Sequence, residues 1–296
     1  MSAARRGATL GELLDWYVDA RTRAGVLHPE RLRASAKPLT THFGELRASA
    51  ISGEAVAAYR LARNDCAPGT IRQDLTVLRA ALNHAHREGW IDRVPRVEIG
   101  PMQPPKDRYL APDEQERLLA GMNGHLWLFT LIGLHTGARK KAILELEWNR
   151  VDFDRGQINF RNPERPETSK RRAVVPMTNR LRRALVVARE AATTQYVIEW
   201  ASRPVGDIGD SFRFAARKAG LDWATPHTLR HTCASMLAQK GVDVDTIADY
   251  LAADRQTIWR VYRRQHPDYL KSAADALDDS PAMEVVETPR PGEHQH

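Results

Sequence analysis

The chain of 296 residues is long enough for two domains that each bury a core of their own. Its 44 Lys and Arg against 37 Asp and Glu give a formal net charge of +7, which fits either a polyanionic partner or a basic surface kept for solubility. Its two cysteines, Cys66 and Cys233, exclude a disulfide framework or a zinc ribbon and fit a reducing compartment. No segment approaches the about 18 apolar residues of a membrane span, so we expect a cytoplasmic protein without membrane contact.

The first hundred residues predict a small all-helical unit. One helix opens with Thr9 and Glu12 at the spacing of a capping box, and a second follows Ser52. The strongest pattern pairs Thr70 with Gln73 as another capping box and then repeats apolar residues at helical spacing. The basic residues expected to remain on the outside, as a DNA-facing stripe or as solvated charge, are Arg60, Arg63, Arg72 and Arg79.

A stretch rich in proline separates this unit from the rest of the chain. Residues 93–110 contain four prolines without any hydrophobic period, which is the composition of a linker. The final segment is polar and contains further prolines, which is typical of disorder. We therefore expect a helical domain over residues 1–100, a linker over 101–107, a second domain over 108–278 and a disordered tail over 279–296.

The second domain is predicted to be mainly helical with a small antiparallel sheet, an α+β fold. Amphipathic or apolar helical patterns run from residue 112 to residue 148 and return after residue 178. Between them, "QINFRN" and "RRAVVPM" are rich in β-branched residues and flank the turn-forming "PERPETSK". This pattern indicates two strands of an antiparallel hairpin.

The stretch "TPHTLRHTCASML" places His227, Arg230 and His231 at the start of an apolar helix. A hydrolytic zinc helix would also need a glutamate directly after the first histidine, and Thr228 stands there instead. His227 and Arg230 are neighbours on one helix face just after Pro226, where backbone N–H groups favour anions. A phosphate site and an ordinary exposed helix surface remain the two interpretations of this stretch.

Other charged residues follow a recognisable order along the chain. Arg139 comes directly after the glycine of "TGAR", Lys170 lies near the predicted hairpin tip, and Tyr262 stands among three arginines. Together with His227 and Arg230 they give the order Arg, Lys, His-x-x-Arg, Tyr. With "TGAR", "PHTLRHT" and "HPDYL", the chain resembles the tyrosine recombinase family, also called phage integrases, over nearly its whole length.

This resemblance implies a helical core-binding domain followed by a catalytic domain that cleaves and rejoins DNA at specific sites. Attack on a phosphodiester builds charge on its non-bridging oxygens, which the planar guanidinium groups of Arg139 and Arg230 would bind. Tyr262 would be the nucleophile that forms a 3′-phosphotyrosyl intermediate, His227 would assist it, and Lys170 would protonate the leaving 5′ oxygen.

The same resemblance implies which partners the protein has. The phosphotyrosyl bond conserves the energy needed for rejoining, so neither a cofactor nor a metal is expected. The expected partners are double-stranded DNA and further subunits, either in a homotetramer on two paired DNA sites or with a related recombinase. The target site is not readable from one sequence, because it depends on a few groove contacts and on DNA deformability.

The chain departs from the family pattern at three positions. Where the family usually has Leu-Gly-His, this chain has Leu251, Ala252 and Ala253, so the histidine that binds phosphate in relatives is absent. Ala142 replaces an acidic residue after the first arginine. A shift of one residue would also put Ser169, in place of Lys170, at the position of the family's lysine. Loss of one electrostatic donor lowers rates by about 10²–10³-fold in comparable sites, which slows strand exchange without abolishing it.

Two alternatives to an active recombinase stay open on the sequence alone. The first is a weak or inactive DNA-binding accessory protein on the same fold. The second is a type IB topoisomerase, which uses similar chemistry without pairing two sites. The rival tyrosines Tyr250 and Tyr269 are interpreted as structural, because one lies in an apolar run and the other follows Pro267 closely.

Overall fold

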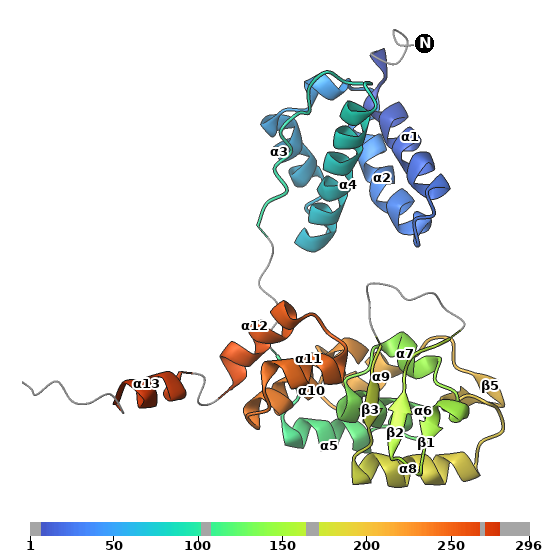
Figure 1. Cartoon of the computed structure of the whole chain (residues 1–296). Helices are drawn as coiled ribbons and strands as arrows, with labels where there is room; N and C mark the ends of the chain where they lie inside the picture. Colours follow the sequence, from blue (N-terminus) through green and yellow to red (C-terminus); the bar gives the residue numbers. More distant parts are fainter. Residues whose placement is uncertain (1–6, 102–107, 164–171, 267–269, 279–296) are drawn as a thin grey trace, which may run out of the picture. The chain divides into compact units, whose positions relative to one another are not determined.

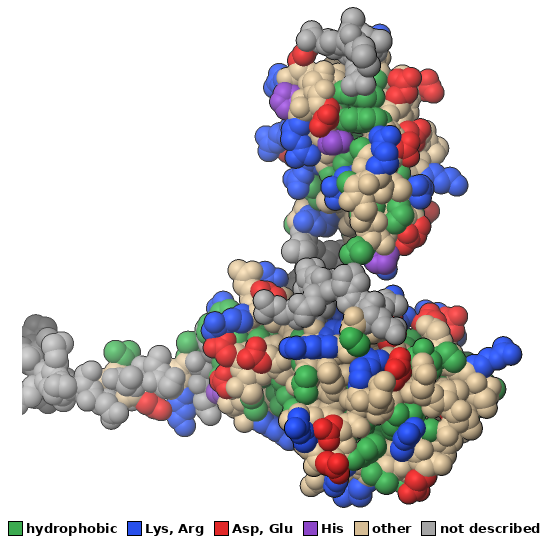
Figure 2. All heavy atoms as spheres, turned by 45° about the vertical axis from the view of Figure 1, so that its right-hand side comes forward, with side chains coloured by type: hydrophobic (Ala, Val, Ile, Leu, Met, Phe, Trp, Pro, Cys, Tyr) green, Lys and Arg blue, Asp and Glu red, His purple; other side chains and the backbone are tan. Residues whose placement is uncertain are grey.

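The computed structural model describes residues 7–101, 108–163, 172–266 and 270–278. The chain divides into two compact units, Met1–Pro105 and Lys106–His296, and each is described by itself (Figure 1). Figure 2 shows Lys and Arg side chains interspersed with Asp and Glu on the visible face of each unit. Within the described ranges, every helix is too short or too polar to cross a membrane.

The described part of the first unit consists of helices α1 to α4 and a short 3₁₀ turn. Thr9 and Glu12 form the predicted capping box, with 2.8 Å from the Thr9 nitrogen to Glu12 Oε2. The Ser52 side chain caps its helix as predicted, accepting from the Ala55 nitrogen at 3.2 Å. The elements are α1 (Leu10–Arg23), α2 (Pro29–Phe43), the 3₁₀ turn Ala48–Ala50, α3 (Gly53–Ala62) and α4 (Pro68–Arg87).

The predicted start of the longest helix is wrong by three residues, because Ala67 is the N-cap residue instead of Thr70. Helix α4 begins at Pro68, so Thr70 and Gln73 lie inside its first turns, and no capping box forms there. Proline is well suited to the first helical turn, because its missing N–H would have no partner there and its φ angle is already helical. The proline therefore determines where this helix starts.

The four arginines that the sequence places on the outside of the first unit differ in their surroundings. Arg63 Nη2 lies 3.5 Å from Asp74 Oδ2, which also accepts from the buried Tyr59 hydroxyl at 2.9 Å. Burial, together with this carboxylate, raises the pKa of Tyr59. Arg79 is exposed, as expected. The prediction that Arg63 belongs to an outward-facing basic stripe is therefore wrong, because its guanidinium balances the charge of the buried Asp74 carboxylate.

Two more of these arginines fasten the segment that leaves the first unit. Arg60 Nη2 donates to the Glu98 carbonyl at 2.7 Å, and Arg72 Nη1 donates to the Gly100 carbonyl. Val97 and Ile99, in the same segment, are buried in the core of this unit. Residues 97–100 therefore pack as part of the helical unit, in a stretch whose composition predicted a linker.

The second unit combines helices with two small antiparallel sheets, which confirms the predicted fold class. Strand β2 pairs with both β1 and β3 in the order β1-β2-β3, with Ile158 opposite Val175 and both side chains buried. The predicted hairpin is therefore present, and its tip, residues 164–171, lies outside the described residues. The strands are β1 (Val151–Asp152), β2 (Gln157–Asn159), β3 (Val174–Pro176), β4 (Glu199–Trp200) and β5 (Arg203–Pro204).

Most described helices of the second unit pack around one large apolar core, whereas α11 and α12 pack with α10 around a smaller one. Helix α6 is buried along nearly its whole length and packs against α10. The two helices approach closely, because a Cβ atom on Gly133 would lie only 2.7 Å from Leu229 Cδ1. The helices are α5 (Pro112–Ala120), α6 (Gly124–Thr136), α7 (Lys140–Leu144), α8 (Asn179–Glu190), α9 (Gly209–Lys218), α10 (Pro226–Gln239), α11 (Val244–Leu251), α12 (Arg255–Gln265) and α13 (Lys271–Asp278), with a 3₁₀ turn at Trp148–Arg150.

Candidate active site

Arg139 lies in a sharp turn between two helices. Gly137 ends α6 in the left-handed conformation, with φ of 60°, and Arg139 is the N-cap residue of α7. The Thr136 hydroxyl accepts from the Ala138 nitrogen at 3.2 Å and closes the turn. A left-handed residue is most easily a glycine, so the sequence "TGAR" directly encodes this turn. The guanidinium thus extends from a short, well-fixed connection.

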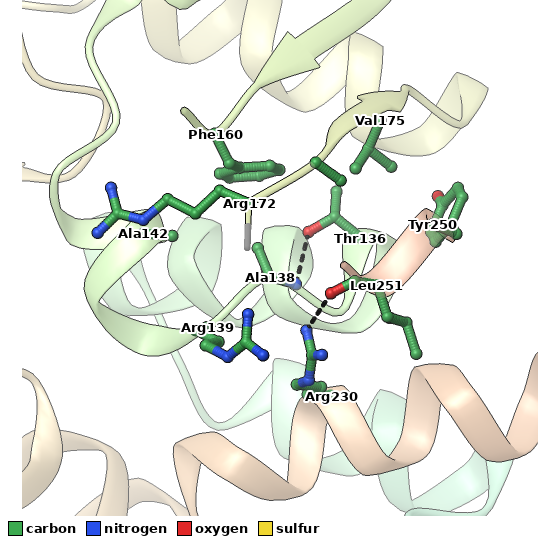
Figure 3. Close-up of a pocket in the computed structure, with 11 residues that line it drawn as sticks. Thr136, Ala138, Arg139, Ala142, Phe160, Arg172, Val175, Arg230, Tyr250 and Leu251 are labelled. Atoms are coloured by element: carbon green, nitrogen blue, oxygen red, sulfur yellow. Dashed lines mark hydrogen bonds between the residues drawn. The ribbon is translucent and has the colours of Figure 1, made fainter. Parts of the chain in front are cut away.

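Arg230 comes from a different element, the first turns of α10, and its guanidinium reaches the same turn. Its Nη1 atom donates to the Gly137 carbonyl at 2.8 Å and to the Leu251 carbonyl at 2.6 Å. Arg139 Nη2 donates to the next carbonyl along, that of Ala252, at 3.3 Å. The two guanidinium groups therefore meet in one pocket, as Figure 3 shows.

Two of the three carbonyls that hold these arginines, those of residues 251 and 252, come from the end of α11 and the strained turn after it. Ala252 adopts a left-handed conformation with φ of 45°, which is uncommon for a residue with a side chain. In the family pattern that the sequence resembles, this position is the glycine of Leu-Gly-His. The turn directs the carbonyls of residues 251 and 252 toward Arg230 and Arg139. We refer to these two arginines and their three carbonyl acceptors as the arginine clamp.

The clamp concentrates positive charge in a partly buried place. Burial, followed by the charge of Arg139, lowers the pKa of Arg230 to about 10, so it stays protonated at neutral pH. Burial, followed by the charge of Arg172, lowers the pKa of Arg139. Like charges that are held together in a desolvated pocket repel each other, and a bound anion relieves this repulsion. The pocket is therefore electrostatically prepared for a phosphate group.

His227 lies one helical turn before Arg230 on α10. Desolvation of its ring, followed by the charges of His231, Arg230 and Arg139, lowers the pKa of His227. The ring is consequently neutral near pH 7 and able to accept a proton. Its centroid lies 6.3 Å from that of His231. The described residues contain no group of three or more metal-binding side chains placed to hold an ion.

The two tyrosines near the site differ in their surroundings. Tyr250 lines the arginine pocket, but its hydroxyl donates to the His135 carbonyl at 2.8 Å and burial raises its pKa. Tyr262 lies on α12 outside the set of residues that line this pocket. Its ring is parallel to that of Trp259 at 6.1 Å and lies 4.6 Å from that of His266. The structure thus brings Arg139 and Arg230 into one pocket, with His227 close enough for both charges to act on its ring. Tyr262 lies outside that pocket and packs against a smaller apolar cluster.

The remaining residues singled out by sequence have mixed outcomes. Lys170 and its alternative Ser169 lie outside the described residues. Ala142 lines the pocket, whereas Ala253 packs against a smaller apolar cluster beneath α10, α11 and α12. Sequence reasoning missed Arg172, which also lines the pocket. The sequence does show a run of three cationic residues, 170 to 172, but it does not reveal which of them lines the pocket.

Comparison with known proteins agrees with this arrangement. Residues 108–268, more than half of the chain, match the model of the phage integrase family. The chain belongs to the phage integrase family. The family match covers α5 to α12 and so includes the arginine clamp, His227 and Tyr262.

Individual members of the phage integrase family are similar to this chain at low identity. The integrase of Salmonella phage P22 is 25% identical over 221 residues, which span 69% of this chain and 56% of that protein. The tyrosine recombinase XerA of Thermococcus kodakarensis is 24% identical over 67% of this chain and 73% of its own length. The Tn1549 transposon integrase, solved with transposon right end DNA, shares the fold with a TM-score of 0.74 at 18% identity, covering 91% of this chain and 99% of that one.

Proposed function

We propose that this chain is a site-specific DNA recombinase that cleaves and rejoins DNA strands through Tyr262. The observation that carries the proposal is the arginine clamp, in which Arg139 and Arg230 converge from two elements on one pocket. Membership of the phage integrase family supports it. The helical first unit would be the core-binding domain over residues 1–100, and residues 108–278 the catalytic domain.

In the proposed reaction the Tyr262 oxygen attacks the phosphorus of one DNA strand. A bond forms between that oxygen and phosphorus, and the bond from phosphorus to the 5′ oxygen breaks. Charge develops on the two non-bridging oxygens, where the guanidinium groups of the clamp offer fixed donors. Because the backbone carbonyls already orient these groups, little reorganisation is needed when the charge appears. The product is a 3′-phosphotyrosyl intermediate and a free 5′ hydroxyl.

Two proton transfers accompany this step. The Tyr262 hydroxyl must lose a proton as it attacks, and neutral His227 is the acceptor that its lowered pKa supports. The 5′ oxygen must gain a proton as it leaves, and Lys170 is the proposed donor. Attack of a 5′ hydroxyl from another strand reverses the same steps and restores the tyrosine. No cofactor and no metal enters this scheme.

The stoichiometry of strand exchange determines the proposed assembly. Two duplexes have four strands, and each strand needs one nucleophile. If each chain contributes one Tyr262, four chains act on two paired DNA sites. We therefore propose a homotetramer on double-stranded DNA, or an assembly with a related recombinase, in the cytoplasm.

The proposal is tested by trapping the covalent intermediate without knowing the target. The full chain is incubated with nicked duplexes that carry a randomised central segment. When the nick lies close to the cleavage site, the short fragment that carries the free 5′ hydroxyl diffuses away, so that rejoining is prevented and the adduct accumulates. Adducts that survive detergent are recovered and the DNA is sequenced. We expect wild type to enrich one motif, Tyr262→Phe to give no adduct, and Tyr250→Phe and Tyr269→Phe to retain it.

Three outcomes would contradict the proposal. Absence of any wild-type adduct, with an adduct in Ala253→His, would indicate a DNA-binding accessory protein that has lost catalysis. An adduct that survives in Tyr262→Phe would assign the nucleophile elsewhere. Cleavage followed by relaxation of a single supercoiled circle, without exchange between two sites, would indicate a topoisomerase.

A further inference from the structure

Arg172 is the third arginine of the pocket and has no part in the function proposed above. It lies just before β3 and reaches toward α7, where Figure 3 shows it beside Ala142. Its Nη2 atom lies 2.9 Å from Glu145 Oε2, and the two side chains are only 22% and 18% exposed. This ion pair is therefore among the more buried in the described part of the second unit.

The other side of the same guanidinium has no partner among the residues that the structure describes. Nη1 of Arg172 is buried and makes no hydrogen bond to any described residue. A buried donor without an acceptor is unfavourable, so native structures usually supply one or leave the place to a ligand. Arg172 is also close enough to Arg139 to lower its pKa. An anion bound beside Arg139 and Arg230 would supply negative charge to these two and an acceptor to Nη1 of Arg172.

Glu145 accounts for one departure from the family pattern. The resemblance predicts an acidic side chain at residue 142, where the chain has alanine, and Glu145 follows three residues later at the end of α7. Its carboxylate pairs with Arg172 and lies 3.8 Å from Lys141 Nζ. The small side chain of Ala142 leaves room beside the pocket, and Arg172 lies there. Glu145 therefore supplies a carboxylate in this region, where the family pattern has one at residue 142.

We infer that Arg172 is a third phosphate-binding residue of this site and that Glu145 positions it, an inference that rests on the proposed recombinase function. One N–H side of the guanidinium binds Glu145, and the other binds a non-bridging oxygen of the scissile phosphate. Such a planar group with two hydrogen-bonding sides is what arginine offers and lysine does not. The ion pair fixes the side-chain direction before DNA binds, as the backbone carbonyls do for the clamp.

A purely structural role would make Arg172 only a link between β3 and α7. The two roles differ in their response to phosphate, so the first experiment measures binding of inorganic phosphate to the full chain. Thermal unfolding is followed in phosphate and in chloride at equal ionic strength. A ligand that binds only the folded state raises the melting temperature, and the rise at a given concentration is larger for tighter binding.

Wild type is expected to be stabilised by phosphate, and Arg172→Ala to bind it about 10-fold more weakly. Arg155→Ala is the matched control, because Arg155 is on the same unit, 81% exposed, and paired only loosely with Asp152 at 3.9 Å. It should respond to phosphate as wild type does. Arg172→Lys and Glu145→Gln keep the size of the side chains and serve if Arg172→Ala fails to fold. Both should bind phosphate more weakly than wild type.

A second experiment asks whether Arg172 acts on the charge of the scissile phosphate. The enriched duplex is prepared with a neutral methylphosphonate at the cleavage position, so that less negative charge develops there. Arg172→Ala should form adducts more slowly than wild type on the ordinary duplex, and the two rates should converge on the methylphosphonate. Rates that differ by the same factor on both duplexes would overturn the assignment.

The outcomes separate this inference from the proposed function. If wild type forms no adduct, the recombinase proposal fails, while the phosphate measurement still decides whether Arg172 binds an anion. If Arg172→Ala loses stability equally in phosphate and chloride, the residue is structural and the inference is wrong. If Glu145→Gln binds phosphate as wild type does, the positioning role of Glu145 is wrong.

Discussion

The arginine clamp and the helix that carries Tyr262 are held in different ways. Both guanidinium groups of the clamp donate to backbone carbonyls, and the turn that carries Arg139 extends from the buried helix α6. Helix α12 buries only Ile258 and Val261 among its described side chains and packs in a smaller apolar cluster. The charged half of the site is thus fixed by hydrogen bonds to three backbone carbonyls, whereas the proposed nucleophile is on a helix with few buried side chains.

This difference suggests a division of labour within the site. Electrostatic stabilisation is most effective when the donors are already oriented before charge develops. A nucleophile that must be engaged at a particular time gains from an element that moves at low cost, and elements with few buried contacts open most easily. Changes to the clamp should therefore affect the rate or the stability strongly, and changes at its borders more weakly.

The largest effect is expected when the clamp loses one guanidinium. Arg230→Lys keeps the charge but loses the planar fork, which lets one side chain contact the carbonyls of Gly137 and Leu251 and still present further N–H groups to a phosphate. The rate of adduct formation under single-turnover conditions should fall by about 10²–10³-fold. Arg155→Lys, an exchange of the same kind on the exposed surface, should leave the rate unchanged. A fall of less than threefold in Arg230→Lys would remove the clamp from the mechanism.

A second way to break the clamp acts through the backbone. Gly137→Ala would place a Cβ atom 2.0 Å from Leu251 Cδ2 on a residue with φ of 60°. Overpacking and left-handed strain together should lower the free energy of unfolding by about 2–4 kcal/mol. Gly156→Ala has a similar φ of 65° with open space around the new Cβ, so it should cost only about 1–2 kcal/mol. Denaturant unfolding of the two variants measures the difference, and equal losses would contradict the packing argument.

The pH dependence of cleavage sharpens the role of His227. Because burial and nearby positive charges lower its pKa, His227 stays neutral until the pH falls below its usual value of about 6.5. The rate of adduct formation should therefore be constant down to that pH and then fall by about tenfold for each further unit. In His227→Gln the rate should be lower overall and lack this fall. A midpoint above the usual value would contradict the assignment.

The smallest effect is expected at the border of the clamp. Ala252 is left-handed, and glycine adopts this conformation without the steric penalty of a Cβ atom. Ala252→Gly should raise the free energy of unfolding by about 0.5–1 kcal/mol while both carbonyls keep their arginines. Thermal unfolding and the rate of adduct formation measure the two effects. A stabilised variant whose rate falls would show that strain in this turn assists the reaction.

The parts of the fold that the sequence predicted are those encoded locally. Thr9 with Glu12, Ser52, and the β-branched residues around the hairpin act on their immediate neighbours, and all three predictions are confirmed. Helix α2 has His28 at its start without a side-chain cap and Pro38 inside, so its pattern gave no clear signal. The convergence of Arg139 and Arg230, and the role of Arg172, depend on contacts between residues far apart in sequence, which no local pattern encodes.

The hydrogen bonds from Arg60 and Arg72 to the carbonyls of Glu98 and Gly100 determine where the helical unit can be truncated. A fragment of the helical unit that stopped at the end of α4 would expose the apolar surface that Val97 and Ile99 cover. It would also set free two guanidinium groups that the intact chain keeps occupied. With this unit as the proposed core-binding domain, we expect such a fragment to bind DNA more tightly, and with a steeper salt dependence, than the same unit extended to residue 100.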